Sequence, residues 1–368
     1  MLRWGLTICL VVNFVWVSAQ TDPTCRTYTL SDFLYPCDEL ELKVNEVFNL
    51  MTDDERVGQM IMPAAGHFGK DPNYVAKLVK EKKVGGIILL TGTKNEFKNS
   101  TNWFDSLNMG KKGVPLMFSA DAELSLINMK IKGTTPIKKA FRIKSAEELS
   151  TETIKICNEL AFMGIHQNFA PVADMSPNAT VGFRSFGNHP DTIVKYCGKF
   201  VEVSSENNIL TCAKHFPGHG NVVGDTHKKL VFIKGEMKEV ELYKPLITQN
   251  IPSIMIGHIA VTENDKYDTE GLPSTCSRKI VTDLLRKEMG FNGLIVTDAL
   301  NMGGVVTVPE CGLKASKAGC DILLMPVDEN ATIKSILREI KTDADYKEQV
   351  YQSVKRIIRL KICMGIIE

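Results

Sequence analysis

Short apolar runs alternate with longer amphipathic segments along most of the chain. Runs of this length that end at polar, glycine or proline positions predict buried strands. There are eight of them, at residues 57–62, 85–90, 114–120, 165–170, 210–213, 253–257, 293–297 and 321–325. Other segments repeat apolar residues every three to four positions and predict helices, as at residues 38–51, 146–163, 193–207, 279–289 and 343–360.

Eight repeats of strand and helix predict a single-domain α/β protein, a parallel (β/α)8 TIM barrel spanning residues 38–368. An open, doubly wound sheet is the alternative, but no glycine-rich phosphate loop follows the first run. Thr52 is expected to cap a short helix whose first turn carries Asp53, Asp54 and Glu55. A polar leader, residues 20–37, precedes this predicted domain.

The first residues have the pattern of a signal peptide. Arg3 precedes an apolar run at residues 6–17, and small residues up to Ala19 provide a cleavage site, so residues 1–19 are expected to be removed. This run is too short for a transmembrane helix and no later run is long enough, so no stable membrane insertion is expected. These features predict an exported protein, either secreted or periplasmic.

Composition is that of an ordinary globular protein, with 368 residues, 44% hydrophobic and 24% charged. A net charge of +1 and the absence of a basic run argue against a nucleic-acid partner. Of the ten cysteines, Cys25–Cys37 and Cys311–Cys320 are close enough in sequence to form local disulfides in an oxidising compartment. Cys212 lies in an apolar run and is expected to be a buried free thiol.

A cluster of titratable residues begins where the fifth apolar run ends. Within residues 214–227 lie Lys214, His215, His219, Asp225 and His227. Proline and glycine residues between them exclude a regular helix. The cluster could be a solvated surface loop, a metal site with histidine and aspartate ligands, or an acid/base pair in which Asp225 orients His227. The acid/base interpretation is favoured because a neighbouring carboxylate fixes the tautomer of an imidazole and raises its basicity; no metal or other cofactor is expected.

Polar residues also end other predicted strands. In parallel barrels the chemistry lies at the carboxyl ends of the strands. Five consecutive runs deliver polar side chains there, namely Asp121, Asp174, Lys214 with His215, His258 and Asp298. Their agreement favours one shared site over unrelated solvated strand ends. Asp298 could act as a nucleophile or base, although such a residue can also serve as the N-cap of the next segment.

Several stretches resemble glycoside hydrolase family 3, in its β-N-acetylglucosaminidase (NagZ-like) branch, from about Leu50 to Ile367. The matching stretches are residues 51–60 (MTDDERVGQM), 168–174 (NFAPVAD), 184–187 (RSFG), 214–220 (KHFPGHG), 225–227 (DTH) and 293–302 (GLIVTDALNM). This resemblance implies a retaining exo-β-N-acetylglucosaminidase that removes terminal β-linked N-acetylglucosamine from peptidoglycan fragments or chitooligosaccharides.

The resemblance also implies roles for individual residues. Asp298 would be the nucleophile, and His227 the general acid/base with Asp225 as its partner. The expected sugar-binding residues are Asp121, Arg184, Lys214 and His215, with His258 at the end of the sixth run.

One segment departs from the family pattern. The family usually follows its Asp-x-Glu with two glycines and then a sugar-binding arginine, whereas Leu124 and Ser125 follow Glu123 here and Lys130 is the nearest cation. The alternatives are therefore a β-glucosidase or sugar phosphorylase of the same fold, a metal-dependent hydrolase, or a non-catalytic exported binding protein. Glycosylation sequons occur at Asn99, Asn178 and Asn330, and a glycan on Asn178 would crowd the site because Arg184 is near in sequence.

Overall fold

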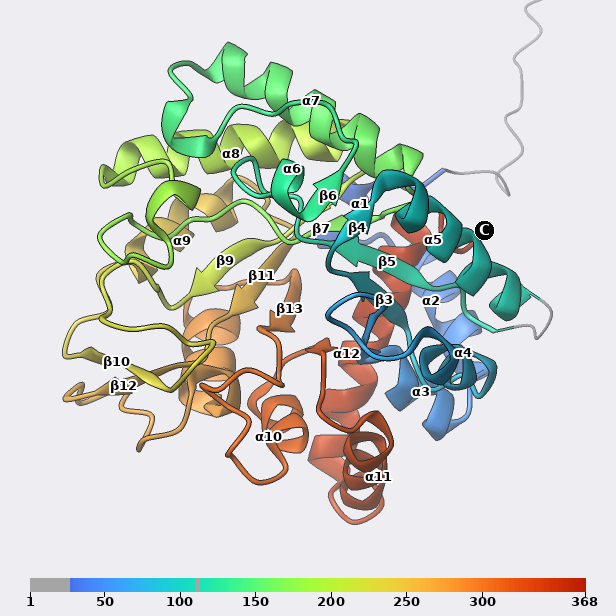
Figure 1. Ribbon diagram of the computed structural model, residues 1–368. Helices are drawn as coiled ribbons and strands as arrows, with labels where there is room; N and C mark the ends of the chain where they lie inside the picture. The colour runs from blue at the N-terminus through green and yellow to red at the C-terminus, as the bar shows by residue number, and fades with distance from the viewer. Residues whose placement is uncertain (1–26, 110–112) are drawn as a thin grey trace, which may run out of the picture.

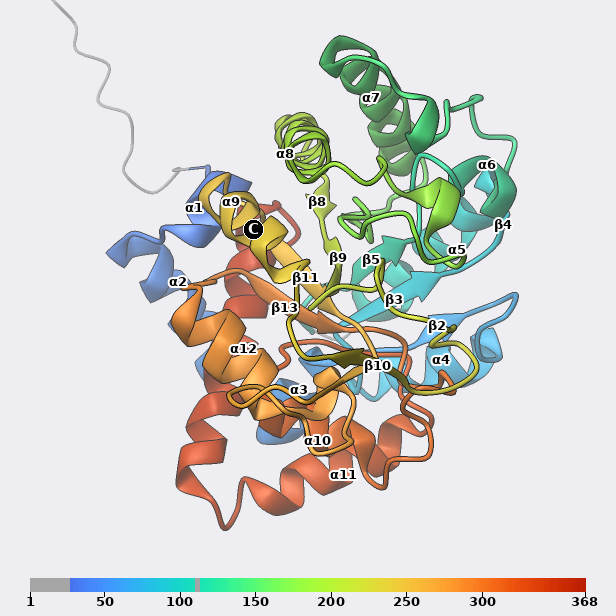
Figure 2. The same cartoon turned by 90° about the vertical axis from the view of Figure 1, so that its left-hand side faces the viewer.

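The computed structural model describes residues 27–109 and 113–368, so the predicted signal peptide lies outside the described residues. Short parallel strands form the centre of the molecule and helices surround them (Figures 1 and 2). The central strands are β1 (Ile61–Met62), β2 (Ala64–Ala65), β3 (Gly86–Leu89), β5 (Met117–Ala120), β7 (Gln167–Asn168), β8 (Leu210–Thr211), β9 (Ala213–Phe216), β11 (Ser253–Ile256), β13 (Leu294–Thr297) and β14 (Leu323–Leu324).

Each of the eight predicted runs contains at least one of these strands. The strands pair in the orders β2-β3-β5-β7-β8, β9-β11-β13 and β14-β1, all parallel. A single bridge between Val296 and Ile322 links β13 to the segment before β14. The predicted α/β class with a TIM-barrel-like arrangement is confirmed, although the ladders form separate short sheets rather than one uninterrupted closed sheet.

Helices cover the strands on their outer side. They are α1 (Leu30–Leu34), α2 (Asp38–Asn49), α3 (Asp53–Gln59), α4 (Pro72–Lys80), α5 (Lys94–Met109), α6 (Ile127–Lys130), α7 (Ala146–Phe162), α8 (Pro190–Glu206), α9 (Val240–Thr248), a π-helical segment (Lys279–Glu288), α10 (Cys311–Ala318), α11 (Glu329–Glu339) and α12 (Ala344–Cys363). The five helices expected from periodicity correspond to α2, α7, α8, the π-helical segment and α12. None of the described helices is long and apolar enough to cross a membrane.

The first predicted strand began too early. Residues 57–59 belong to α3, and β1 starts only at Ile61. The reason is the predicted helix cap: the Thr52 hydroxyl accepts a hydrogen bond from the Glu55 amide at 3.3 Å, and the Glu55 carboxylate accepts one from the Thr52 amide at 2.8 Å. This reciprocal cap starts a helix that carries Val57 into the core on its buried face.

The fifth predicted strand ended too early. β9 continues to Phe216, so Lys214 and His215 lie within a strand instead of after it. The strand is extended by parallel pairing with β11, in which Ala213 lies beside Ile254 and Phe216 beside Ile256. Sequence alone does not show this pairing, because the two strands are about forty residues apart.

Two strand pairs outside the centre were not predicted. They are β4 (Gly92–Thr93) with β6 (Ile131–Lys132), and β10 (Val231–Lys234) with β12 (Ile259–Thr262). Val231 and Ile259 of the second pair form a small buried cluster with Val222. This cluster supports the loop that carries Asp225 and His227.

The predicted Cys311–Cys320 disulfide is wrong, because both cysteines are free. Cys311 begins α10 and Cys320 follows its end, which places their Cα atoms more than about 10 Å apart at 1.5 Å per residue. The predicted Cys25–Cys37 pair stays a prediction, since Cys25 lies outside the described residues. Cys212 is a buried free thiol, as expected.

Lys361 of α12 is fully buried at the amino-terminal ends of the strands. Its ammonium donates hydrogen bonds of 2.7 Å to the Gln59 side chain and to the carbonyl oxygens of Gly85 and Pro115. These three acceptors precede β1, β3 and β5, so one side chain joins the starts of three neighbouring strands.

We expect Lys361→Met to lower the free energy of unfolding by about 2–4 kcal/mol, because three buried acceptors lose their donor while the volume is kept. The exposed Lys341→Met should change it by less than about 0.5 kcal/mol. Equilibrium denaturation of both variants checks this, and equal effects would show that the buried ammonium is not needed.

Candidate active site

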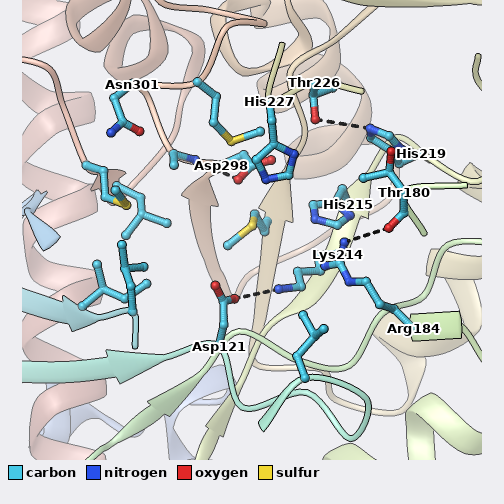
Figure 3. A pocket seen from close by; sticks show the side chains of 18 of the residues that line it. Asp121, Thr180, Arg184, Lys214, His215, His219, Thr226, His227, Asp298 and Asn301 are labelled. Carbon is cyan, nitrogen blue, oxygen red and sulfur yellow. Dashed lines mark hydrogen bonds and ion pairs between the residues drawn. The ribbon is translucent and has the colours of Figure 1, made fainter. Parts of the chain in front are cut away.

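One cavity of about 520 Å³ opens at the carboxyl ends of the central strands. Its walls include six of the eight predicted site residues, namely Asp121, Arg184, Lys214, His215, His227 and Asp298 (Figure 3). Asp225 and His258 do not line it. The cavity thus brings together side chains from loops and strands that are far apart in the sequence.

Asp298 directly follows β13 and holds its carboxylate at the cavity. Its amide donates to the Ile256 carbonyl oxygen at 2.9 Å, and its Oδ1 accepts from the Ala299 amide at 2.8 Å. Burial acts to raise the pKa of this carboxyl, but His258, His215 and the Ala299 amide outweigh burial and lower the pKa. The carboxylate is therefore ionised at neutral pH. No described helix begins here, which argues against a simple N-cap role.

His227 also lines the cavity, on a segment we call the His227 loop (residues 217–230, between β9 and β10). Asp225 Oδ1 accepts a hydrogen bond from the His227 amide at 3.0 Å and lies 2.8 Å from its Nδ1. Because Nδ1 is engaged by the carboxylate, Nε2 is left for a substrate. The His227 side chain is 62% exposed and, like Asp298, it lines the cavity (Figure 3).

Backbone hydrogen bonds hold the His227 loop against the segment that follows Asp298. The Gly304 amide donates to the Thr226 carbonyl oxygen at 2.9 Å, and the Gly303 amide to that of His227 at 3.0 Å. A Cβ at Gly303 would lie 2.3 Å from the Lys228 carbonyl oxygen, so only glycine permits this approach. The two loops that carry Asp298 and His227 are therefore joined directly.

Asn178 holds the other side of the His227 loop. Its side-chain amide nitrogen donates hydrogen bonds to the carbonyl oxygens of Val222 at 2.7 Å and Gly224 at 3.0 Å. Its backbone amide donates to the Gly220 carbonyl oxygen at 2.8 Å. Asn178 is buried. The nitrogen to which a glycan would be attached is thus engaged inside the protein. The Asn178 side chain supports the loop, and the expected crowding of the site by a glycan does not fit this arrangement.

Glu239 binds the first part of the same loop. Its carboxylate accepts hydrogen bonds from the amides of Met175 at 2.6 Å, Gly220 at 3.0 Å and Asn221 at 3.1 Å. Burial, together with the nearby charge of Asp174, raises the pKa of Glu239 to about 7. Sequence reasoning missed this residue, because it lies in a polar stretch without a motif.

The opposite part of the cavity contains a network of buried charges. Asp121 accepts hydrogen bonds from Lys214 at 2.8 Å and from Lys130 at 2.7 Å. Glu123 binds Arg184 through two hydrogen bonds of 2.8 and 2.7 Å and lies 2.7 Å from the Lys214 ammonium. Burial would raise the pKa of the Glu123 carboxyl, but Arg184 and Lys214 lower it to about 2. Both carboxylates are therefore charged, and three cations surround them.

Lys130 lines the cavity. It is the nearest cation to the segment in which the sugar-binding arginine of the family is absent. It reaches Asp121 from the end of α6, nine residues along the chain. In the sequence, the only indication of a role for Lys130 was that it is the cation nearest to the place of the family's arginine. Glu123 was visible as the second acid of the same motif, but its bidentate pairing with Arg184 required the structure.

His215 and His258 are held by different partners. His215 Nδ1 lies 2.6 Å from Asp174 Oδ2, and Asp174 Oδ1 accepts from the His215 amide at 3.0 Å. His258 is fully buried, with Nδ1 3.0 Å from the Thr275 hydroxyl and Nε2 2.9 Å from the Ala299 carbonyl oxygen. Since its two nitrogens are engaged by Thr275 and by the Ala299 backbone, His258 supports the segment next to Asp298. Its expected contact with a sugar stays a prediction.

The histidines do not converge as metal ligands. Across residues 27–109 and 113–368, no group of three or more His, Cys, Asp or Glu side chains is arranged to hold a metal ion. His215 and His227 are instead bonded to separate aspartates.

Comparison with known proteins identifies the family. Residues 52–360 match the glycosyl hydrolase family 3 N terminal domain. The chain belongs to this family. A β-N-acetylglucosaminidase/β-glucosidase of Cellulomonas fimi is 25% identical over 336 residues, covering 86% of this chain and 58% of that protein. The chain therefore spans little more than half the length of this relative.

Solved structures agree with the family assignment. A glycoside hydrolase family 3 β-N-acetylglucosaminidase from Paenibacillus sp. str. FPU-7 is 26% identical with a TM-score of 0.78, covering 86% of this chain and 63% of that one. The β-glucoside phosphorylase BglX bound to 2FGlc shares the fold with a TM-score of 0.78 at 21% identity, covering 89% of this chain and 62% of that one.

We expect Asn178→Ala to loosen the His227 loop, because two loop carbonyl oxygens lose their donor. Amide hydrogen exchange at Gly303 and Gly304, whose partners lie in this loop, should become at least about tenfold faster. Asn99→Ala, at an exposed sequon, is the matched control and should leave both rates unchanged. Unchanged exchange in Asn178→Ala would show that the loop is held by its other contacts.

Proposed function

We propose that this chain is a retaining exo-β-N-acetylglucosaminidase acting on terminal β-linked N-acetylglucosamine in peptidoglycan fragments or chitooligosaccharides. The observation that carries the proposal is that one cavity is lined both by an ionised Asp298 and by a His227 that is hydrogen-bonded to Asp225. Family membership supports it, as do the β-N-acetylglucosaminidase names of two relatives. We also infer that the separate ladders represent a closed (β/α)8 barrel, because their pairings lead from each strand to the next and back to β1.

The reaction follows from the two facing groups. Asp298 attacks the anomeric carbon and forms a covalent glycosyl-enzyme, while His227 donates its Nε2 proton to the departing oxygen. His227 then takes a proton from water, which attacks the same carbon and releases the sugar and the Asp298 carboxylate. Asp225 stabilises the imidazolium form of His227, so a histidine serves where most glycosidases use a second carboxylate.

The buried charges fit the binding of a sugar. Asp121 and His215 can accept hydrogen bonds from hydroxyl groups, and Arg184, Lys214 and Lys130 can donate to sugar oxygens. Each cation is already paired with a carboxylate, so it keeps a fixed position when the cavity loses its water. Lys130 is the nearest cation to the place where the family has its arginine, but as a single ammonium it cannot bind two oxygens in one plane.

A sugar phosphorylase is the second candidate. His227 is neutral or cationic when it activates the acceptor, so it repels phosphate less than a carboxylate would, and the cavity wall carries three cations. The β-glucoside phosphorylase BglX shares this fold. A β-glucosidase would act on a sugar that carries a hydroxyl group in place of the acetamido group. Comparing the rates on a β-glucoside and on the matching β-N-acetylglucosaminide decides between these two activities.

Export remains part of the proposal. The predicted signal peptide at residues 1–19 supports secretion or transfer to the periplasm. Expression of the full chain should yield an exported protein that begins at Gln20, as read by N-terminal sequencing; an intact Met1 in the cytoplasm would contradict it.

We expect Asp298→Ala to reduce kcat/KM for 4-nitrophenyl β-N-acetylglucosaminide by about 10⁴-fold or more, because the covalent intermediate cannot form. His227→Ala should cost about 10²–10⁴-fold with a poor leaving group and much less with 4-nitrophenol, which needs no proton. Steady-state kinetics on both substrates test this.

The exposed Asp345→Ala is the matched control and should retain full activity. An Asp298→Ala rate equal to wild type would disprove the nucleophile assignment. The same assay in phosphate buffer separates the two candidates, since a phosphorylase releases N-acetylglucosamine 1-phosphate and a hydrolase releases the free sugar.

A further inference from the structure

Two glycines in the first part of the His227 loop lie against one buried side chain, that of Glu239. A Cβ at Gly218, whose φ is 131°, would lie 2.4 Å from the Glu239 Cβ. A Cβ at Gly220 would lie 2.1 Å from the Met175 carbonyl oxygen and 2.5 Å from Glu239 Oε1. Only glycine therefore permits the backbone to pass this close to the carboxylate. At this separation the carboxylate accepts hydrogen bonds from the amides of Met175, Gly220 and Asn221.

Asp174 and Glu239 place two buried carboxylates against the same stretch of backbone. Asp174 Oδ1 accepts from the His219 amide at 2.8 Å, and its Oδ2 lies 2.6 Å from His215 Nδ1. Burial would raise the pKa of Asp174, but His215 lowers it, so this carboxyl is ionised at neutral pH. For Glu239, burial and the charge of Asp174 raise the pKa to about 7, and the groups that lower it are backbone amides instead of cations. Of the two, Glu239 is the carboxyl that gains a proton in mildly acidic solution.

The other titratable groups near Glu239 leave this assignment unchanged. Tyr243 of α9 is fully buried, and burial together with Asp174 and Glu239 raises its pKa well above the usual range, so it stays neutral. The remaining groups are His215 and His219, whose amides both donate to Asp174, and the exposed Lys234, Glu236 and Lys238, which share a surface groove with Glu239. Solvent screens the three exposed charges.

A short series of contacts leads from Glu239 to His227. Gly220, whose amide Glu239 binds, directly follows His219, and the His219 side chain is buried and lines the cavity. His219 Nε2 lies 3.3 Å from the Thr226 hydroxyl (Figure 3). Thr226 directly precedes His227 in the chain. The first part of the loop and the residue beside the imidazole are thus joined, so a movement at Gly220 is passed on to His227.

We propose that Glu239 is a positioning residue for the acid/base step: its ionised carboxylate holds the His227 loop in place, and protonation of this carboxylate releases the loop. The inference rests on the proposed function, in which His227 donates the proton. Both oxygens of an ionised carboxylate accept hydrogen bonds, whereas a protonated one carries a hydroxyl that donates. At least one of the three amides then loses its acceptor, and because a buried amide without an acceptor is costly, the loop changes its contacts.

The first test compares two substrates of the wild-type protein from about pH 5 to pH 9. The sugar that leaves N,N′-diacetylchitobiose needs a proton, whereas the 4-nitrophenol that leaves the aryl β-N-acetylglucosaminide does not. Below about pH 7, kcat/KM should fall about tenfold per pH unit for the disaccharide and stay nearly constant for the aryl glycoside. Asp298 cannot cause this decline, because its pKa is lowered from a value that is already acidic. A decline for both substrates, or for neither, overturns the inference.

The second test removes the charge. Glu239→Gln keeps the size of the side chain but replaces one acceptor oxygen with a donor. Above pH 7 it should lower kcat/KM for the disaccharide about 10–100-fold, the scale of a misplaced catalytic group, and change that for the aryl glycoside by less than about threefold. The decline of the disaccharide rate towards acidic pH should disappear. Glu236→Gln, exposed in the same surface groove, is the matched control and should behave as wild type.

Amide hydrogen exchange provides a readout that does not depend on turnover. In wild type, protection at Gly220 and Asn221, corrected for intrinsic exchange rates, should fall about tenfold from about pH 8 to about pH 6. In Glu239→Gln it should be low at both pH values. Protection that depends neither on pH nor on Glu239 overturns the inference. Absence of turnover for both glycosides, with pH-dependent protection kept, overturns the proposed hydrolase activity alone.

Discussion

The contact between the His227 loop and the segment after Asp298 is the constraint on which the site depends. Two backbone hydrogen bonds, from Gly303 and Gly304 to the carbonyl oxygens of His227 and Thr226, join elements that come from β9 and β13. Neither loop could fix its own reactive group relative to the other, because each is long and rich in glycine. Asn178 and Glu239 form further hydrogen bonds with the same loop, at Val222 and at Gly220. The imidazole and the carboxylate thus share one cavity although their loops leave different strands.

The charged half of the cavity is governed by the cost of burying ions. Lys214 is buried between Asp121 and Glu123, and Glu123 also binds Arg184. Removing any one of these side chains would leave its partner charged and without compensation in a poorly solvated place, which costs more than the pair itself contributes. The network therefore keeps polar groups fixed before a substrate arrives. Prior order of this kind is what transition-state stabilisation requires.

Stability and binding are separated between the two ends of the strands. At the amino-terminal end, the Lys361 ammonium satisfies three acceptors and joins the starts of β1, β3 and β5. At the carboxyl end, the residues that face the cavity include strained or exposed apolar side chains, such as Phe68 and Met325. This division is usual for parallel α/β folds, in which one face of the strands provides stability and the other carries the variable loops.

The sequence by itself determined the fold class, the positions of the eight central strand segments and the stretches that carry the candidate chemistry. These follow from hydrophobic periodicity and from local motifs, which act over a few residues. It could not determine the length of β9, the separation of Cys311 from Cys320, or the burial of both His258 nitrogens, because each depends on partners far along the chain. Only the tertiary structure decided that Lys130 reaches Asp121, that Asn178 is engaged by the His227 loop, and that Phe68 and Met325 line one cavity. Contacts of this kind are set by how distant segments pack, and no short-range pattern records them.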